Sequence, residues 1–412
     1  MRKVSRAYVL SSIITFLIPV LGVIFTFINI RDGKERKYFV LLSIFAFSVI
    51  YFIPPYQDLF RRYTLQFLAY NDGTTYMQAI DGHVDIIMYV VILFFKKNDI
   101  PFFIFPALQS AISVYLFLSA TKDVIDSNEN YSHKNVIYLL SFLMVNFVGI
   151  ALGLRFGFAV AMFTKSVTLV ILARKRFSGG ILMLLSALMH FSLILPIAIF
   201  LSSKFIKINK KLTPIFCIVA FLLSKFLIYY ILNHLNLGNI NDYAKDGYVE
   251  GKYAAADNSG NAMVVTYYRY LYMIVIYLLF FFSKKQEDEK LQKLENFINI
   301  FIISCFFTAI SATAFNRYFN GIAVYFIFML VLSVLYVRFD KVVRMIFVIL
   351  VVFNSFFQSV YLLRRPIILG EMWRGLYTPV IFVVNYSDKD FSSYLKVIDS
   401  DGDWVAQKYS AD

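Results

Sequence analysis

Long apolar runs alternate with short polar loops along almost the whole chain. Eleven runs come close to the roughly 20 residues that an α-helix needs to cross a bilayer. They are residues 7–28, 38–54, 101–120, 135–152, 156–173, 179–201, 212–235, 265–282, 296–315, 319–337 and 343–362. A twelfth run, His83 to Phe95, is shorter and is expected to be a tilted span or a re-entrant segment. The pattern predicts an all-α, polytopic integral membrane protein with about 11–13 transmembrane helices.

Three polar segments interrupt this pattern and define the expected domain organisation. Residues 55–85 and 235–264 are expected to be two longer external loops of a single polytopic membrane domain, residues 1–363. Residues 364–412 are expected to form a polar C-terminal tail. No internal repeat is found in the sequence, which argues against transporter folds built from repeats.

Lysine and arginine in short loops set the expected topology, because cytoplasmic loops are enriched in both. The basic loops that are therefore placed on the cytoplasmic side are 31–37, 174–177, 284–290 and 338–344. The two external loops, a turn at 316–320 and the tail then lie outside. The run 179–201 has basic clusters at both of its ends, so either this run is re-entrant or the rule fails once.

Composition supports a membrane protein and excludes a soluble one. The chain of 412 residues is 59% hydrophobic and 16% charged, whereas soluble domains carry about a quarter charged residues. The net charge of +14 is explained by the positive-inside signal and by attraction to anionic membrane lipids, and we expect no nucleic-acid partner. The two cysteines, Cys217 and Cys305, form no recognisable motif.

One arginine, Arg155, stands inside apolar sequence, in the stretch LRFGFAVA. A charge at mid-bilayer costs at least about 2.5–3.5 kcal/mol, so such residues are rare and often functional. Gly153 and Gly157 permit a helix break at this point, so the arginine either snorkels to the interface or faces an anion. A planar guanidinium binds two phosphate oxygens at once, which favours a phosphate as that anion.

His190 stands in the middle of another apolar run, six residues before Pro196. A histidine there is either a packing residue or a group that transfers a proton or binds a sugar hydroxyl. No second histidine lies at metal-ligand spacing, which excludes a zinc site at this position.

The first external loop contains DLFRRY, with Asp58, Arg61, Arg62 and Tyr63. On a helix Asp58 and Arg62 are four residues apart, so the simplest interpretation is an ion pair worth a few tenths of a kcal/mol. The alternative is an acid and two bases presented to an anionic sugar or a pyrophosphate.

Two further motifs carry polar residues on the proposed outer face. In DGHVD, the side chains of Asp81, His83 and Asp85 share a face only on a strand, so a metal site there is a minor alternative. In FNRYFN, Arg317 and Tyr318 are expected in a tight turn between two spans.

The segment from Leu152 to Phe200 resembles the EpsG family of polysaccharide polymerases, which is related to the Wzy O-antigen polymerases. An arginine opens a small-residue helix, a basic turn follows, and an alanine-rich segment ends in histidine and a nearby serine. The matching residues here are Arg155, Arg174 to Arg176, Ala187, His190 and Ser192. The chain departs from the pattern at Phe156 and Met189, where many relatives have glutamine and phenylalanine.

The resemblance implies a glycosyltransferase that joins lipid-linked repeat units at the outer face of the bacterial cytoplasmic membrane. The growing glycan would leave undecaprenyl pyrophosphate for a hydroxyl of the next lipid-linked unit, without a metal ion or cofactor. Arg155, His190 and Asp58 are then the expected catalytic residues. The residues expected to bind pyrophosphate or glycan are Arg317, Arg61, Arg62, Tyr63 and Tyr318. A chain-length regulator and a flippase are expected partners.

Two other functions remain open at the level of sequence. A lipid-linked glycan ligase would move a finished chain to another acceptor by the same chemistry. A transporter or flippase of lipid-linked oligosaccharide would line a path with the same basic residues and form no bond. The sequence does not distinguish capsule, O-antigen and exopolysaccharide as the product.

Overall fold

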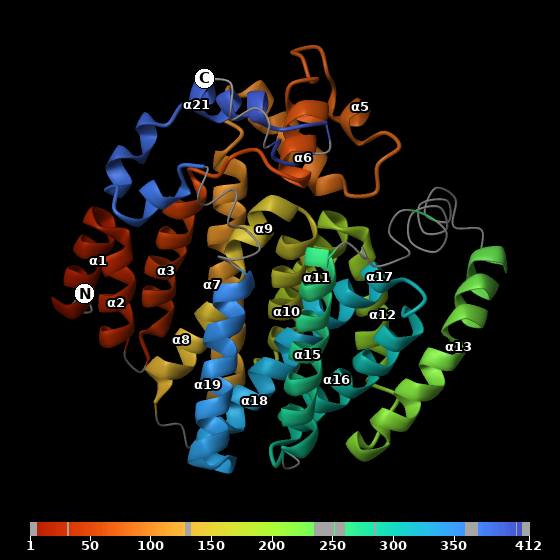
Figure 1. Ribbon diagram of the computed structural model, residues 1–412. Helices are drawn as coiled ribbons and strands as arrows, with labels where there is room; N and C mark the ends of the chain where they lie inside the picture. Colours follow the sequence, from red (N-terminus) through yellow and green to blue (C-terminus); the bar gives the residue numbers. More distant parts are fainter. Residues whose placement is uncertain are drawn as a thin grey trace.

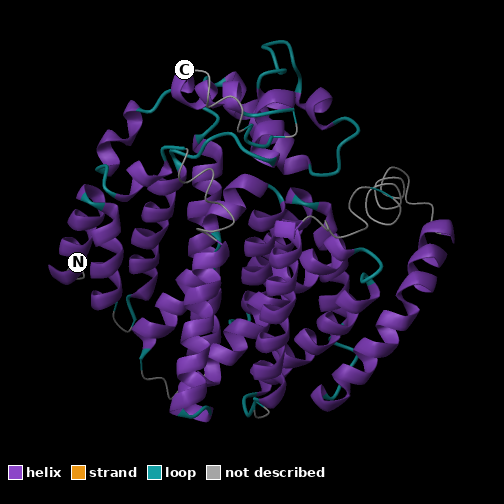
Figure 2. Cartoon of the chain, in the orientation of Figure 1, coloured by secondary structure: helices purple, strands orange, loops and turns teal. Residues whose placement is uncertain are grey.

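A computed structural model describes residues 6–30, 33–127, 133–234, 251, 260–283, 286–358, 370–400 and 402–405. Helices form nearly all regular structure in these residues (Figure 2). In chain order they are α1 (Arg6–Leu17), α2 (Pro19–Asn29), α3 (Glu35–Ile50), α4 (Asp58–Arg62), α5 (Tyr76–Ile80), α6 (Ile86–Lys97), α7 (Ile104–Asp126), α8 (Lys134–Met144), α9 (Phe147–Gly153), α10 (Phe156–Ile171), α11 (Arg176–Met189), α12 (Ile194–Ser202), α13 (Thr213–His234), α15 (Gly260–Phe282), α16 (Glu289–Phe307), α17 (Ala312–Tyr318), α18 (Val324–Arg338), α19 (Lys341–Phe356) and α21 (Asp388–Ser393).

The all-α, polytopic membrane fold is confirmed. Five segments among the described residues are long and apolar enough to cross a bilayer. They are Ile104–Asp126, Lys134–Gly153, Lys210–Tyr230, Met263–Phe282 and Ala312–Tyr336. Shorter apolar helices stand beside them in the same bundle (Figure 1). Several of the expected spans, among them 7–28, 135–152 and 179–201, are broken helices rather than single rods.

The first apolar run, expected as one helix over 7–28, is two helices. Pro19 starts α2 and has no backbone N–H to give to α1, so the helix ends at Leu17. The two short helices lie side by side (Figure 1), and Gly22 approaches Thr15 so closely that a β-carbon would meet its hydroxyl at 2.3 Å. The run 135–152 is broken in the same way between α8 and α9, at Val145 and Asn146.

The run 179–201 is a helical hairpin, which supports the re-entrant alternative. Helix α11 ends at Met189, and the chain turns at His190 before α12 begins. At one end of the run Arg174 lies close enough to Glu289 for their charges to interact. At the other end the Lys210 ammonium pairs with Glu295 at 3.2 Å. Both basic clusters therefore lie at the N-terminal end of α16, on one side of the bundle.

A cap of short helices covers the opposite end of the bundle. We define the cap as residues 52–103 with 370–400 and 402–405, which include α4, α5, α6 and α21 (Figure 1). Helix α6, expected as a tilted span or re-entrant segment, belongs to this cap. Most of the other expected external loop, 235–264, lies outside the described residues.

The expected tight turn at 316–320 is wrong. These residues continue from α17 into a π-helical turn, Phe319–Ala323, and on into α18. The chain instead turns before α17, where Ser311 caps the helix by accepting a hydrogen bond from the Ala314 amide. Arg317 and Tyr318 consequently project from a helix rather than from a loop.

Cysteine labelling tests the hairpin. We expect cysteines at Lys175 and Lys207, both exposed, to react with an impermeant maleimide from the same side of the membrane. A cysteine at Asp72, in the cap, is the control and should react from the other side. The native Cys217 and Cys305 are buried and add little background. Labelling of positions 175 and 207 from opposite sides in cells and inverted vesicles would disprove the hairpin.

Candidate functional site

Arg155 is presented by a strained turn between α9 and α10. The residue before it, Leu154, is fully buried and has φ +43° and ψ −54°, which a branched side chain rarely adopts. The amide of Arg155 donates to the carbonyl of Gly153 at 2.5 Å, which closes a γ-turn. Strain of this kind persists only where the surroundings enforce it, and it is often found at functional sites.

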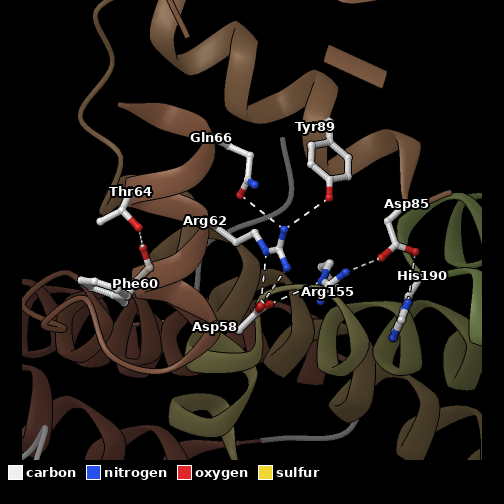
Figure 3. A network of polar contacts seen from close by, with 9 residues as sticks. All are labelled: Asp58, Phe60, Arg62, Thr64, Gln66, Asp85, Tyr89, Arg155 and His190. Atoms are coloured by element: carbon white, nitrogen blue, oxygen red, sulfur yellow. Dashed lines mark hydrogen bonds and ion pairs between the residues drawn. The ribbon is translucent and has the colours of Figure 1, made fainter. Parts of the chain in front are cut away.

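Two carboxylates from separate segments of the cap hold the Arg155 guanidinium (Figure 3). Its Nη1 donates to Asp85 Oδ2 at 2.7 Å, and its Nε donates to Asp58 Oδ2 at 3.4 Å. The Asp85 side chain is 2% exposed and the Arg155 side chain 21%. Arg155 therefore does not snorkel, because its charge is compensated inside the protein.

The same Asp85 carboxylate joins Arg155 to the hairpin turn at His190. Its Oδ1 lies 3.1 Å from His190 Nδ1 and accepts the Phe191 amide at 3.0 Å. The break in α11 leaves the Phe191 amide without a helical acceptor, and Asp85 satisfies it. A hydrogen bond between Nδ1–H and Asp85 leaves Nε2 as the nitrogen with the free lone pair.

Asp58 extends the network on its other side. Its Oδ1 accepts from Nε and Nη2 of Arg62 at 3.2 and 3.0 Å, which confirms the ion pair predicted from the four-residue spacing. Nη1 of Arg62 in turn donates to Gln66 and to the Tyr89 hydroxyl. The Tyr89 ring stacks on His83 at 3.8 Å.

A cavity of about 420 Å³ opens beside this network. Its polar lining consists of Asp58, Arg61, Arg155, His190, Arg317 and Asn146. Its apolar lining consists of Phe117, Ile150, Phe156, Val160 and Tyr325, together with Gly149, Gly153, Gly157 and Gly321. Three arginines and one carboxylate give the lining a net positive charge, which suits an anionic ligand. A β-carbon on Gly153 would meet no other atom within 4 Å, so this glycine leaves room in the cavity.

Ionisation of the cap residues follows from these contacts. Burial raises the pKa of Asp85, but the hydrogen bonds with His190 and the Phe191 amide and the charge of Arg155 bring it below its usual value. Burial and the charge of Arg62 lower the pKa of His83. At neutral pH the site therefore contains a charged Asp85 and an uncharged His83.

The structure brings most of the expected site residues together. Arg155, His190, Asp58, Arg61 and Arg317 all line the cavity, and Arg62 binds the outer oxygen of Asp58. Tyr63 and Tyr318 do not line it. Tyr63 is buried among the aromatic rings of the cap, and the Tyr318 hydroxyl donates to the Ser192 carbonyl next to the hairpin turn.

Sequence reasoning considered Asp85 only as a possible metal ligand and missed its contacts with Arg155 and His190. This residue precedes α6, where an aspartate usually caps the helix, but its carboxylate makes no cap hydrogen bond and turns to Arg155 and His190. The alternative of a metal site in DGHVD is not supported by the geometry, because Asp85 faces Arg155 while His83 stacks on Tyr89. No group of three potential ligands is found among the described residues.

Replacing Asp85 tests the network independently of any activity. We expect Asp85→Asn to lose about 3 kcal/mol of stability at neutral pH. The variant leaves the buried Arg155 guanidinium with Asp58 as its remaining carboxylate, at 3.4 Å. The lowered pKa of Asp85 means that its contribution is complete above the usual value of 3.8 and disappears as the pH falls below it. Melting temperatures of the two proteins should therefore converge in acid. Asp72→Asn, at an exposed position, is the control, and equal melting of D85N and wild type at pH 7 would contradict the network.

The EpsG family matches residues 56–373, a span that contains every residue of the cavity lining. Neither the curated proteins nor the solved structures give a match. Because the matched span covers well over half of the 412 residues, the chain belongs to the EpsG family, a membrane protein family linked to polysaccharide synthesis.

Proposed function

We propose that the protein polymerises lipid-linked oligosaccharide repeat units at the outer face of the cytoplasmic membrane of a bacterium. The observation that carries the proposal is the cationic cavity beside the carboxylate-bound His190, in a membrane protein of this family. The donor is a glycan on undecaprenyl pyrophosphate, and the acceptor is a hydroxyl of the next lipid-linked unit.

The arginines of the cavity are suited to the leaving group. As the glycosyl bond breaks, negative charge grows on the departing pyrophosphate, and fixed cations stabilise it most where water is scarce. Arg155, Arg61 and Arg317 line the same cavity, so their charges act on one ligand. Asp58 and Asp85 hold Arg155 in place, so little reorganisation is needed when the charge develops.

His190 is suited to activate the acceptor. In the proposed step the acceptor oxygen attacks the anomeric carbon, its proton moves to His190 Nε2, and the carbon–oxygen bond to pyrophosphate breaks. The electron pair of that bond leaves with the pyrophosphate. Asp85 fixes the ring through Nδ1 and stabilises the imidazolium that forms. The apolar and glycine-rich side of the cavity offers a surface for the lipid-linked part of either substrate.

One experiment separates this proposal from the ligase and the flippase. The test uses detergent-solubilised protein with lipid-linked repeat units isolated from cells that lack the gene. A polymerase yields a ladder of products that differ by one repeat unit, whereas a ligase transfers once to another acceptor. A flippase forms no new bond in detergent, so an unchanged substrate would overturn the proposal. A chain-length regulator, as a proposed partner, would change only the ladder's length distribution.

Arg155→Lys tests the role of the guanidinium. Lysine keeps the charge but cannot bind Asp58 and Asp85 through one planar group, so we expect elongation to fall on the order of a hundredfold. Arg344→Ala, at the opposite end of the bundle, is the control and should elongate normally. A full-length ladder from R155K at a wild-type rate would remove Arg155 from the proposed chemistry.

His190→Gln tests the base. Losing a general base lowers a rate typically by about 10²- to 10⁴-fold, and we expect turnover to fall in this range while the protein still binds the lipid-linked substrate. His133→Ala changes an exposed histidine before α8 and should leave turnover unchanged. Normal product from the His190 variant would restrict this residue to packing in the hairpin turn.

A further inference from the structure

The C-terminal part of the cap packs directly against the segment that carries Asp58. We call the described residues 386–400 and 402–405 the docked tail. They follow the end of the family match at residue 373. We propose that the docked tail is a positioning element that fixes the backbone before Asp58 and thereby aligns its carboxylate with Arg155. This inference rests on the proposed function only for its kinetic consequence.

The contact to the backbone is made by Gly402. Its carbonyl accepts the Gln57 amide at 2.8 Å, directly before Asp58. Gln57 has φ +56° and ψ −129°, angles that non-glycine residues adopt only where the surroundings over-determine them. Gly402 itself has φ +84°, and a β-carbon there would lie 2.7 Å from the Gln57 carbonyl oxygen. The close approach therefore requires glycine at position 402.

Aromatic side chains fix the docked tail on both sides of this contact. Trp404, 6% exposed, lies edge-on to Tyr56, and Phe391, fully buried, lies edge-on to Tyr63. Tyr56 and Tyr63 flank α4, so the docked tail contacts the chain on both sides of this helix. An antiparallel β-bridge between Ile398 and Trp404 stabilises the turn within the docked tail.

The geometry explains why this contact reaches the site. Asp58 is the first residue of α4, and the first turn of a helix has no intrahelical hydrogen bonds to its own amides, so its position depends on the residue before it. A shift of Gln57 therefore moves the Asp58 carboxylate. This carboxylate accepts from Arg155 Nε at 3.4 Å and from Nε and Nη2 of Arg62. Displacements of about 1 Å in such networks can cost a hundredfold in rate.

A double-mutant comparison tests the proposal with the full chain in detergent and the isolated lipid-linked repeat units. We expect Gly402→Ala to lower turnover about tenfold or more with little change in KM, since Asp58 would act on the transition state. The same substitution made in an Asp58→Asn protein should cost less than about twofold, because the group it positions is already lost. Losses that multiply in the double variant, or a wild-type turnover for G402A, would overturn the inference.

The control is Gly33→Ala, which also adds a β-carbon at positive φ, here +77°, but meets no other atom within 4 Å. It should leave turnover unchanged. If G402A does not fold, Trp404→Ala replaces it in the same comparison, because it removes the contact with Tyr56 without changing a glycine. The same two outcomes then decide the inference.

Hydrogen exchange separates a failure of this inference from a failure of the proposed function. Whether or not the wild type elongates glycan, we expect the amides of Gln57 and Arg61, which donate to Gly402 and Gln57, to be protected in wild type and in G33A, and to exchange faster in G402A. Unchanged exchange in G402A would overturn the positioning role. Absence of elongation by the wild type, with the expected exchange, would overturn only the proposed chemistry.

Discussion

The double ion pair of Arg155 is the interaction on which the arrangement of the site depends. A largely buried guanidinium without a partner would be costly, and so would a buried Asp85 carboxylate without one. In the ion pairs the opposite charges compensate each other. Because each residue belongs to a different segment, the ion pairs also join these segments. Asp58 comes from α4, Asp85 from the loop before α6, and Arg155 from the turn before α10. Because Asp85 also binds the Phe191 amide, the hairpin turn joins the same cluster.

Irregular backbone gathers around this cluster. Leu154 and Gln57 have positive φ, α11 breaks at His190, and π-helical turns follow Arg62 and Tyr318. Each irregularity frees backbone groups or redirects a side chain toward the cavity, as π-helical turns often do at functional sites. Non-helical backbone at membrane depth is tolerated where protein or a water-filled cavity surrounds it. The polar cavity is therefore the kind of surroundings in which these broken helices are tolerated.

Hydropathy predicted where apolar segments lie, but it did not predict where they break. The breaks at Pro19 and His190 depend on local backbone groups and on partners distant in sequence, such as Asp85 for the Phe191 amide. Residue type predicted Arg155 as a site residue, because a charge is unusual inside an apolar run, whereas Asp58 and Arg317 were predicted from polar motifs between the runs and from the family resemblance. The same reasoning misplaced Tyr63 and Tyr318, whose aromatic rings serve packing as well as binding. Asp85 was considered only as a metal ligand in DGHVD, because its partners Arg155 and His190 are distant in sequence.

A second buried cation on α10 shows why the surroundings, and not burial alone, distinguish the site. Lys165 pairs with Asp123 and donates to the Ser119 carbonyl, both on α7, and Asp123 also accepts from Thr168 and lies 3.9 Å from Arg36. The Lys165 and Asp123 side chains are less than 10% exposed, and neither lines the cavity. Arg155, ten residues earlier, is more exposed and stands among further arginines. A compact ammonium suits the closed pair, whereas the fork of a guanidinium can hold two carboxylates and still face a third anion. The chemistry of the two side chains thus matches a structural role at one position and a ligand at the other.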